Sequence, residues 1–216
     1  MEINVKNRII DKIIHLILNL KNKNVPIEPC FFSKDFKYSQ NITFGDYTYG
    51  NPNVIQWDEK TKLNVGKFCS IANDVKIYLG GNHHSEWATT YPFNNIPNHF
   101  PSLSYIPGAT FSKGDVNIGS DVWLASTCVI LSGVTIGNGA VVGANSVVSK
   151  NIGAYEIFVG NPATFVRKRF SDKHILMLNE MEWWNWDIET IINKGDLLCS
   201  SNIDQLYEFY LMNYTI

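Results

Sequence analysis

Charged side chains are scarce in this sequence, and neither sign dominates. Asp, Glu, Lys and Arg make up 18% of the 216 residues, the net charge is −2, and the isoelectric point is about 6.2. A protein that binds nucleic acid usually carries a basic stripe or patch, so this composition argues against nucleic-acid binding. Hydrophobic residues reach 45%, which favours a folded protein with apolar surface to bury, including surface between subunits.

The sequence also lacks the cysteine and histidine spacings that mark metal sites. Its four cysteines, at positions 30, 69, 128 and 199, form neither a disulfide framework nor a zinc-binding pattern. We therefore expect a reducing compartment and a cytoplasmic location. The five histidines show no H-E-x-x-H spacing, so we expect no catalytic metal.

No apolar run is long enough to cross a membrane, which takes about 20 residues. Residues 9–18 repeat isoleucine at helical spacing, but Asp11 and Lys12 interrupt them and no cleavage site follows, which argues against a signal peptide. We expect an N-terminal helix and an irregular lead-in over residues 1–41. Docking of this helix on its own protein or on a neighbouring subunit is preferred. The alternative is peripheral contact with a membrane surface.

What the sequence does contain is an aliphatic residue at every sixth position. The series runs through Ile118, Leu124, Ile130, Ile136, Val142 and Val148, with an earlier block at Val65, Ile71 and Ile77. A period of six matches neither a helix nor a flat strand, whose side-chain periods are 3.6 and 2.0. It is typical of an all-β solenoid, in which short parallel strands wind with about three strands per coil and the aliphatic residues point inward.

The limits of the repeat define the expected domain organisation. The β-helix domain is predicted over residues 42–160, with a long inserted loop at about 81–113 that is rich in proline and aromatic residues. A loop this long inside a compact fold is uncommon and usually functional. Residues 161–216 are predicted to form a C-terminal helical tail, in which Ser171 caps a helix that begins at Asp172.

The inserted loop begins with two glycines and two histidines, in the run Gly80-Gly-Asn-His-His84. Two glycines let the backbone approach a ligand closely, and histidine transfers protons near neutral pH. Because the pair lies where the repeat breaks, a functional histidine is favoured over a structural one. Ser85 stays open as a nucleophile, although it lies in no recognisable nucleophile motif.

A basic cluster follows the last coil. Arg167, Lys168 and Arg169 come shortly after the turn sequence Gly160-Asn-Pro-Ala163. Three cations beside such a turn can hold the phosphates of a nucleotide. The alternative is a solvated run of charge, and the position directly after a solenoid favours the phosphate interpretation.

Several motifs resemble the hexapeptide-repeat xenobiotic acetyltransferases, the chloramphenicol and streptogramin acetyltransferase family, and the related sugar O-acetyltransferases. The matching stretches, within about residues 42–210, are Leu63-Asn-Val-Gly-Lys-Phe-Cys-Ser-Ile-Ala72, Gly80-Gly-Asn-His-His-Ser-Glu-Trp87, Thr90-Tyr-Pro-Phe93, Asp121-Val-Trp-Leu-Ala125, Gly160-Asn-Pro-Ala163, Arg167-Lys-Arg-Phe170 and Trp183-Trp-Asn-Trp186.

The resemblance implies a left-handed parallel β-helix and a homotrimer with its active sites between subunits, where acetyl-CoA binds. The family's catalytic histidine maps onto His83, while His84 stands where relatives commonly carry arginine. The residues expected to bind the cofactor are Trp123, Ala125, Ala144, Lys150, Asn161, Pro162, Arg167, Lys168 and Arg169. Those expected to bind the acceptor are Tyr47, Tyr49, Asn82, His84, Trp87, Tyr91, Phe93 and Tyr105.

The implied reaction is direct O-acetyl transfer, with neutral His83 accepting the proton of an acceptor hydroxyl. We expect a small-molecule or glycan acceptor and prefer a sugar hydroxyl of a surface-glycan precursor. The N-terminal helix could bring the enzyme to a membrane-borne glycan, and the segment 49–63 is shorter than in the drug-acetylating relatives. The alternatives are a drug hydroxyl, as in chloramphenicol or a streptogramin, N-acetylation of an amino sugar, and a trimeric solenoid scaffold without activity.

Overall fold

A computed structural model describes residues 32–106 and 108–214, which belong to one compact unit. The expected N-terminal helix lies outside these residues. In the part of the chain that is described, no helix is long and apolar enough to span a membrane.

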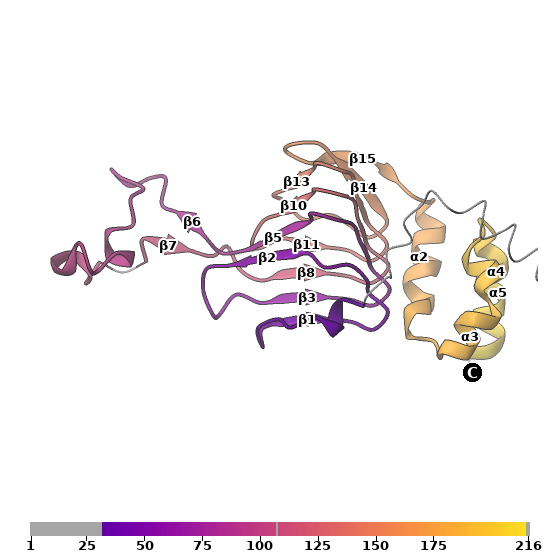
Figure 1. Cartoon of the computed structure of the whole chain (residues 1–216). Coiled ribbons are helices and arrows are strands. Elements are labelled where there is room, and N and C mark those ends of the chain that lie inside the picture. Colours follow the sequence, from indigo (N-terminus) through magenta and orange to yellow (C-terminus); the bar gives the residue numbers. More distant parts are fainter. Residues whose placement is uncertain (1–31, 107, 215–216) are drawn as a thin grey trace, which may run out of the picture. The chain divides into compact units, whose positions relative to one another are not determined.

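Three sheets of parallel coil strands form the sides of a β-helix, and the third sheet ends in one antiparallel strand (Figure 1). The first contains β1 (Ile42–Phe44), β3 (Leu63–Val65), β8 (Val116–Ile118) and β11 (Thr135–Ile136). The second contains β2 (Asn53–Gln56), β5 (Lys76–Leu79), β10 (Val129–Ile130) and β13 (Val147–Val148). The third contains β4 (Ser70–Ile71), β9 (Trp123–Leu124), β12 (Val141–Val142), β14 (Glu156–Val159) and β15 (Thr164–Lys168).

The strand register explains the period of six. Ile118 pairs with Ile136, Leu124 with Val142, and Ile130 with Val148, so each aliphatic residue lies beside the one three repeats further along. Three hexapeptides therefore make one coil, and the predicted β-helix of hexapeptide repeats is confirmed.

The interior of the coils is apolar and closely packed. Leu124, Ile130 and Val142 are each 0% exposed, and the cysteines at the inward positions 69 and 128 are equally buried. Burial raises the pKa of Cys69 to about 11 and that of Cys128 to about 12, so both thiols stay protonated at neutral pH and act as small hydrophobes.

One coil strand lies outside the regular six-residue repeat. Residues 50–62, which lack the period of six, contain β2, and its Val54 pairs with Ile77 of β5. The turn after β2 is closed by Asp58, whose carboxylate accepts hydrogen bonds from the backbone N–H groups of Lys60 and Thr61 at 2.8 and 2.7 Å. The extra residues of this turn shift the phase of the repeat.

The inserted loop leaves the coils after β5 and returns at β8, and Figure 1 draws it projecting from one end of the strands. It contains β6 (Asn82–His83) and β7 (Thr110–Phe111), which pair antiparallel, and the short 3-10 helices η2 (Phe93–Asn95) and η3 (Pro101–Leu103). A further 3-10 helix, η1 (Ser33–Asp35), precedes the first strand.

Helices form the C-terminal tail and are drawn beyond the other end of the strands in Figure 1. They are α2 (Asp172–Met181), η4 (Trp183–Asn185), α3 (Ile188–Asn193), α4 (Gly195–Leu198) and α5 (Ile203–Tyr214). Ser171 caps α2 by accepting a hydrogen bond from the N–H of His174, as the sequence predicts. A second apolar core joins Tyr155 of the last coil to Leu178, Met181 and Trp186 of the tail.

Candidate active site

The imidazole of His83 stands at the base of the inserted loop. Its strand, β6, is held by pairing with β7, which aligns His83 with Thr110. The Nδ1 atom of His83 lies 2.7 Å from the carbonyl oxygen of Thr90. Because a carbonyl oxygen only accepts hydrogen bonds, Nδ1 carries the proton of the neutral ring, and the lone pair is left on Nε2. This is the tautomer that a general base needs.

Asn82 ties the base of the loop to the coils. Its side-chain amide donates to the hydroxyl of Ser132 at 3.0 Å and to the carbonyl of Phe111 at 3.3 Å. Ser132 is buried at the corner after β10, so the contact links His83's own strand to the rigid interior. Both amide donors of Asn82 are therefore used within the protein, which gives the side chain a structural role; its expected contact with the acceptor stays a prediction.

The two glycines before His83 make room for protein rather than for a ligand. A Cβ atom at Gly81 would come within 2.5 Å of Nε1 of Trp57, and one at Gly80 within 2.9 Å of the Asp58 carboxylate. Both glycines have a positive φ angle, which residues other than glycine rarely adopt. Trp57 is 65% exposed beside the loop base, and the sequence analysis missed it because it lies in a turn outside the repeat.

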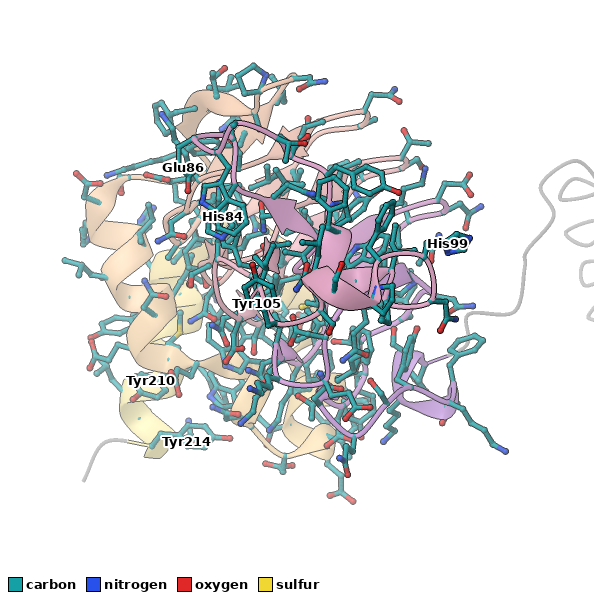
Figure 2. The ribbon with its side chains drawn as sticks, turned by 90° about the vertical axis from the view of Figure 1, so that its left-hand side faces the viewer. His84, Glu86, His99, Tyr105, Tyr210 and Tyr214 are labelled. Carbon is teal, nitrogen blue, oxygen red and sulfur yellow. The ribbon has the colours of Figure 1, made fainter. Side chains whose placement is uncertain are left out.

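His84 packs into the loop instead of facing a ligand. Its ring stacks on Trp87 at 4.4 Å and lies 4.7 Å from Phe111, and its Nδ1 is 2.6 Å from the Glu86 carboxylate (Figure 2). The ring contacts and the carboxylate leave His84 with a packing role, so His83 is the stronger candidate for the base. Among the described residues no hydrogen bond joins Ser85 to either histidine, so a serine–base pair is not formed.

An apolar cavity of about 130 Å³ lies within the loop. Its lining includes the predicted acceptor residues Trp87, Tyr91 and Phe93, together with Thr89, Asn94, Ile106 and Ala109. Thr89 and Tyr91 flank Thr90, whose carbonyl holds His83, so the cavity and the base share one backbone segment. Tyr105 is 78% exposed and does not line the cavity.

Asn94 is a cavity residue that sequence reasoning missed. Its Oδ1 atom is buried, and none of the described residues donates a hydrogen bond to it. A buried oxygen without a donor is costly, so a ligand that brings an O–H or N–H group to this point is favoured. Nothing in the local sequence distinguishes Asn94 from its neighbour Asn95, whose amide instead donates to Thr110.

Tyr47 and Tyr49 lie apart from this cavity in one protomer. Tyr47 stacks on Phe68 at 4.7 Å, and Phe68 in turn contacts Trp183 of the tail at 5.0 Å. Tyr49 pairs through its backbone with Phe32 and Ser70. One chain therefore does not bring these tyrosines together with His83.

The expected cofactor residues divide between two sides of the β-helix. Trp123 is 52% exposed on β9, and Ala125, Ala144 and Asn161 follow the strands of the same third sheet. Ala125 is only 8% exposed, and Asn161 and Pro162 form a cis peptide in the turn after β14. Lys150 follows β13 of the second sheet, on the corner from which the loop departs, and is not grouped with the others.

The basic cluster lies at the end of the β14–β15 hairpin, and its members differ. Arg167 and Lys168 are exposed on β15; Lys168 pairs with Asp172 at 2.5 Å, and Arg167 donates to the Lys168 carbonyl at 3.0 Å. Arg169 instead pairs with Asp121 at 3.1 Å and donates to the carbonyl of Gly139 at 2.7 Å. Arg169 is thus engaged by the protein, which makes Arg167 and Lys168 the better candidates for binding phosphate.

Within residues 32–106 and 108–214, no three His, Cys, Asp or Glu side chains come together as a metal site would need. The features relevant to chemistry are His83, which is held through Nδ1 at the base of the loop, and the exposed cations Arg167 and Lys168 on β15. This arrangement is suited to proton transfer and to holding a phosphorylated ligand.

Comparison with known proteins identifies the family. Residues 115–150 match the bacterial transferase hexapeptide family, six repeats. The chain is 42% identical over 155 residues to a chloramphenicol acetyltransferase of Morganella morganii, a match that covers 71% of this chain and 73% of the relative. It is 43% identical to a probable macrolide acetyltransferase of Lysinibacillus sphaericus, covering 69% and 84% of the two chains. A virginiamycin A acetyltransferase of Staphylococcus aureus is 35% identical over 189 residues, covering 81% and 84%.

The chain belongs to the hexapeptide-repeat acetyltransferase family that contains these xenobiotic acetyltransferases, and it is an acetyltransferase.

Proposed function

We propose that this protein transfers an acetyl group from acetyl-CoA to a hydroxyl of a small apolar acceptor, with His83 as the general base. The observation that carries this proposal is the 2.7 Å contact between Nδ1 of His83 and the Thr90 carbonyl, which in the neutral ring puts the proton on Nδ1 and the lone pair on Nε2. Thr89 and Tyr91, on either side of Thr90, line the loop cavity, so the cavity and the contact that orients the base share one backbone segment.

Bound acetyl-CoA supplies the acetyl group as a reactive thioester. Nε2 of His83 takes the proton from the acceptor hydroxyl as that oxygen forms its bond to the thioester carbonyl carbon. The carbon–sulfur bond then breaks, and the imidazolium returns the proton to the departing thiolate, so charge and protons balance. In the described part of the chain Ser85 makes no hydrogen bond to His83 or His84, so we propose direct transfer in a ternary complex rather than through an acyl-serine.

The residues of the third sheet offer chemical groups that suit the two parts of the cofactor. Trp123, Ala144 and Asn161 offer an exposed face to the pantetheine arm, and Arg167 and Lys168 offer cationic donors to the phosphates. Phosphate groups favour arginine and lysine donors because the hydrogen bonds are charge-assisted. Lys150 lies on another corner of the β-helix, and we assign it to the cofactor of a neighbouring subunit.

We further propose a homotrimer with left-handed coils and sites between subunits, as the family resemblance implies. Support comes from the separation of the parts in one chain: the His83 loop leaves the corner between the second and first sheets, whereas Trp123 is exposed on the third sheet. Light scattering checks the trimer. Co-expressed chains carrying His83→Ala and Arg167→Ala/Lys168→Ala should regain activity at low acetyl-CoA, because mixed trimers contain sites with both parts intact.

The cavity favours an antibiotic-like acceptor over the sugar that the sequence favoured. Trp87, Tyr91, Phe93 and Ile106 give it mostly apolar walls, and the relatives named above act on chloramphenicol and virginiamycin A by their names. A sugar is the second candidate, supported by the buried Oδ1 of Asn94, which needs a donor such as a sugar O–H group.

Thiol release from acetyl-CoA over an acceptor panel tests the proposal. The panel holds chloramphenicol, a streptogramin A and several sugars, with fully O-acetylated versions of each acceptor as matched controls. We expect release with a drug and none with its acetylated control. Release with sugars alone would move the acceptor to the second candidate, and CoA binding without release from any acceptor would support a scaffold.

A further inference from the structure

The strand that carries Arg167 and Lys168 is weakly supported by its own sheet. All five residues of β15 are exposed, and its single strand partner is β14, with a register irregularity between Ile157 and Phe158. The turn that leads into β15 is fixed by a hydrogen bond from the N–H of Ala163 to the Val147 carbonyl at 2.9 Å. The other end, where the two cations lie, needs a separate anchor.

Arg169 is that anchor, and it binds three successive coils. Its backbone N–H donates to the Tyr155 carbonyl at 2.8 Å, and its Nη1 reaches the Gly139 carbonyl at 2.7 Å and the Asp121 carboxylate at 3.1 Å. Asp121, Gly139 and Tyr155 all have left-handed backbones, with φ of 57°, 65° and 57°, and occupy the same corner of consecutive coils. The side chain of Arg169 therefore joins two of these coils by hydrogen bonds, and its backbone N–H joins the third.

The corner is shaped around the guanidinium. Arg169 lies 5.4 Å from the centre of the Tyr155 ring and 5.1 Å from that of Phe170, a cation–π arrangement. A side chain at position 139 would overlap the Tyr155 ring, so glycine is required there. Burial raises the pKa of Asp121, and Arg169 only partly opposes that rise, so the pair is a poor source of net stability and a better source of geometry.

Asp121 also connects this corner to the cofactor face. It lies two residues before Trp123, the first residue of β9, and Arg169 follows Lys168 directly. We infer that Asp121 and Arg169 are positioning residues that hold the cationic strand at a fixed place relative to Trp123, so that both ends of bound acetyl-CoA are received together. This inference rests on the proposed function, and it assigns to Arg169 a role through Arg167 and Lys168 rather than on the phosphate itself.

Two acetyl donors test the inference. Acetyl-CoA carries the nucleotide phosphates and S-acetylpantetheine lacks them. We expect Arg169→Ala to raise the KM for acetyl-CoA about tenfold, the scale of one charge-assisted hydrogen bond, with kcat little changed. With S-acetylpantetheine, kcat/KM should stay within about twofold of the parent enzyme. An equal loss with both donors would show a merely structural role and overturn the inference.

A double-mutant cycle gives an independent readout that uses acetyl-CoA alone. In an Arg167→Ala/Lys168→Ala background, adding Arg169→Ala should raise the KM no further, because residues that act as one unit are not additive. A full additional tenfold rise would mean that Arg169 acts on its own. Lys173→Ala is the matched control, because it removes an exposed ion pair with Asp204 in the same tail. It should leave the KM for acetyl-CoA and for S-acetylpantetheine unchanged.

Two milder variants test the same inference if Arg169→Ala does not fold. Asp121→Asn keeps a hydrogen-bonding oxygen for Arg169, and Arg169→Lys keeps the charge but cannot bridge both Asp121 and Gly139. Both should show the same selective effect on acetyl-CoA, smaller in size, and an effect on both donors alike would contradict the inference. A parent enzyme that releases no thiol from acetyl-CoA would instead refute the proposed function.

Discussion

The coils and the inserted loop differ in how their residues are held. From residue 114 to 152 each coil strand places aliphatic residues such as Leu124, Ile130 and Val142 inside, with no exposed area. Between residues 81 and 113, Ala109 alone is buried among the residues that the structure describes. The coils repeat one set of contacts many times, whereas the loop depends on a few single contacts.

The loop nevertheless carries the proposed chemistry. His83, the cavity and Asn94 all belong to it, while the coils supply anchors such as Ser132 and the turn at Asp58. Regions with little buried surface open most readily, so a base placed there keeps its geometry only through such anchors. The residues that stabilise the fold and the residues proposed to act on the substrate therefore lie in different regions, so a substitution can change one property without the other.

The largest expected effect is on activity alone. His83→Ala should lower kcat by about 10²–10⁴-fold, the usual contribution of a general base, because no other described group replaces Nε2. The side chain is exposed, so the melting temperature should change little. Initial-rate assays and thermal unfolding measure the two quantities on one sample.

His83→Asn is the matched control for positioning. The asparagine amide can still donate to the Thr90 carbonyl but offers no basic nitrogen. It should be as inactive as His83→Ala; an Asn variant with near-full activity would show that the ring acts by holding the loop and not by accepting a proton.

The next effect is on stability alone. Ile130→Ala removes a side chain with no exposed area and should lower the free energy of unfolding by about 2–5 kcal/mol. Phe93→Ala, in the loop, should leave global stability nearly unchanged and raise the KM for the acceptor. Denaturant unfolding compares the two, and an equal loss of stability would mean that loop and coils unfold as one packed unit.

The sequence anticipates the coils well because each position repeats a physical rule. Inward positions must be aliphatic, and a strict period of six leaves one winding that satisfies all of them, as the pairing of Ile118 with Ile136 shows. The period of six does not predict β2, because the turn at Asp58 adds residues and shifts the phase of the repeat. Ser171 is readable for another reason, since a helix cap depends only on residues within one turn.

The residues of the site are harder to predict from the sequence, because their contacts are long-range and partly made by the backbone. His83 is marked by its place at the break in the repeat, yet its partner is the carbonyl of Thr90, which any residue would supply. Arg169 looks identical to Arg167 in the sequence, and only the fold brings it to Asp121, 48 residues earlier. Charge clusters in a sequence therefore indicate a site without dividing its members between ligand and scaffold.

A smaller effect is expected from loosening the loop's anchor. Asn82→Ala removes the hydrogen bond to Ser132 and should lower kcat about tenfold to a hundredfold, since a small displacement of a base is enough to cost this much. Ser132→Ala breaks the same contact from the coil side and should match it. If both changes are silent, β6–β7 pairing alone holds His83. The double variant should be no worse than either single one.

The smallest expected effect is a pH dependence at the turn beneath the loop. Burial alone would raise the pKa of Asp58, but hydrogen bonds from Thr61 and Lys60 outweigh it and hold the pKa below its ordinary value. Protons therefore bind more tightly to the unfolded chain, so the stabilisation is present above the unfolded pKa of about 3.9 and is lost as the pH falls through the folded pKa.

Asp58→Asn should lower the free energy of unfolding by less than about 1 kcal/mol near pH 6, because the group is partly solvated, and this loss should shrink below about pH 4. Thermal unfolding across this range measures it, with Glu59→Gln as the control for loss of one negative charge in the same turn. A cost that grows as the pH falls would reverse the sign of the linkage and show that the turn at Asp58 does not depend on the ionised carboxylate.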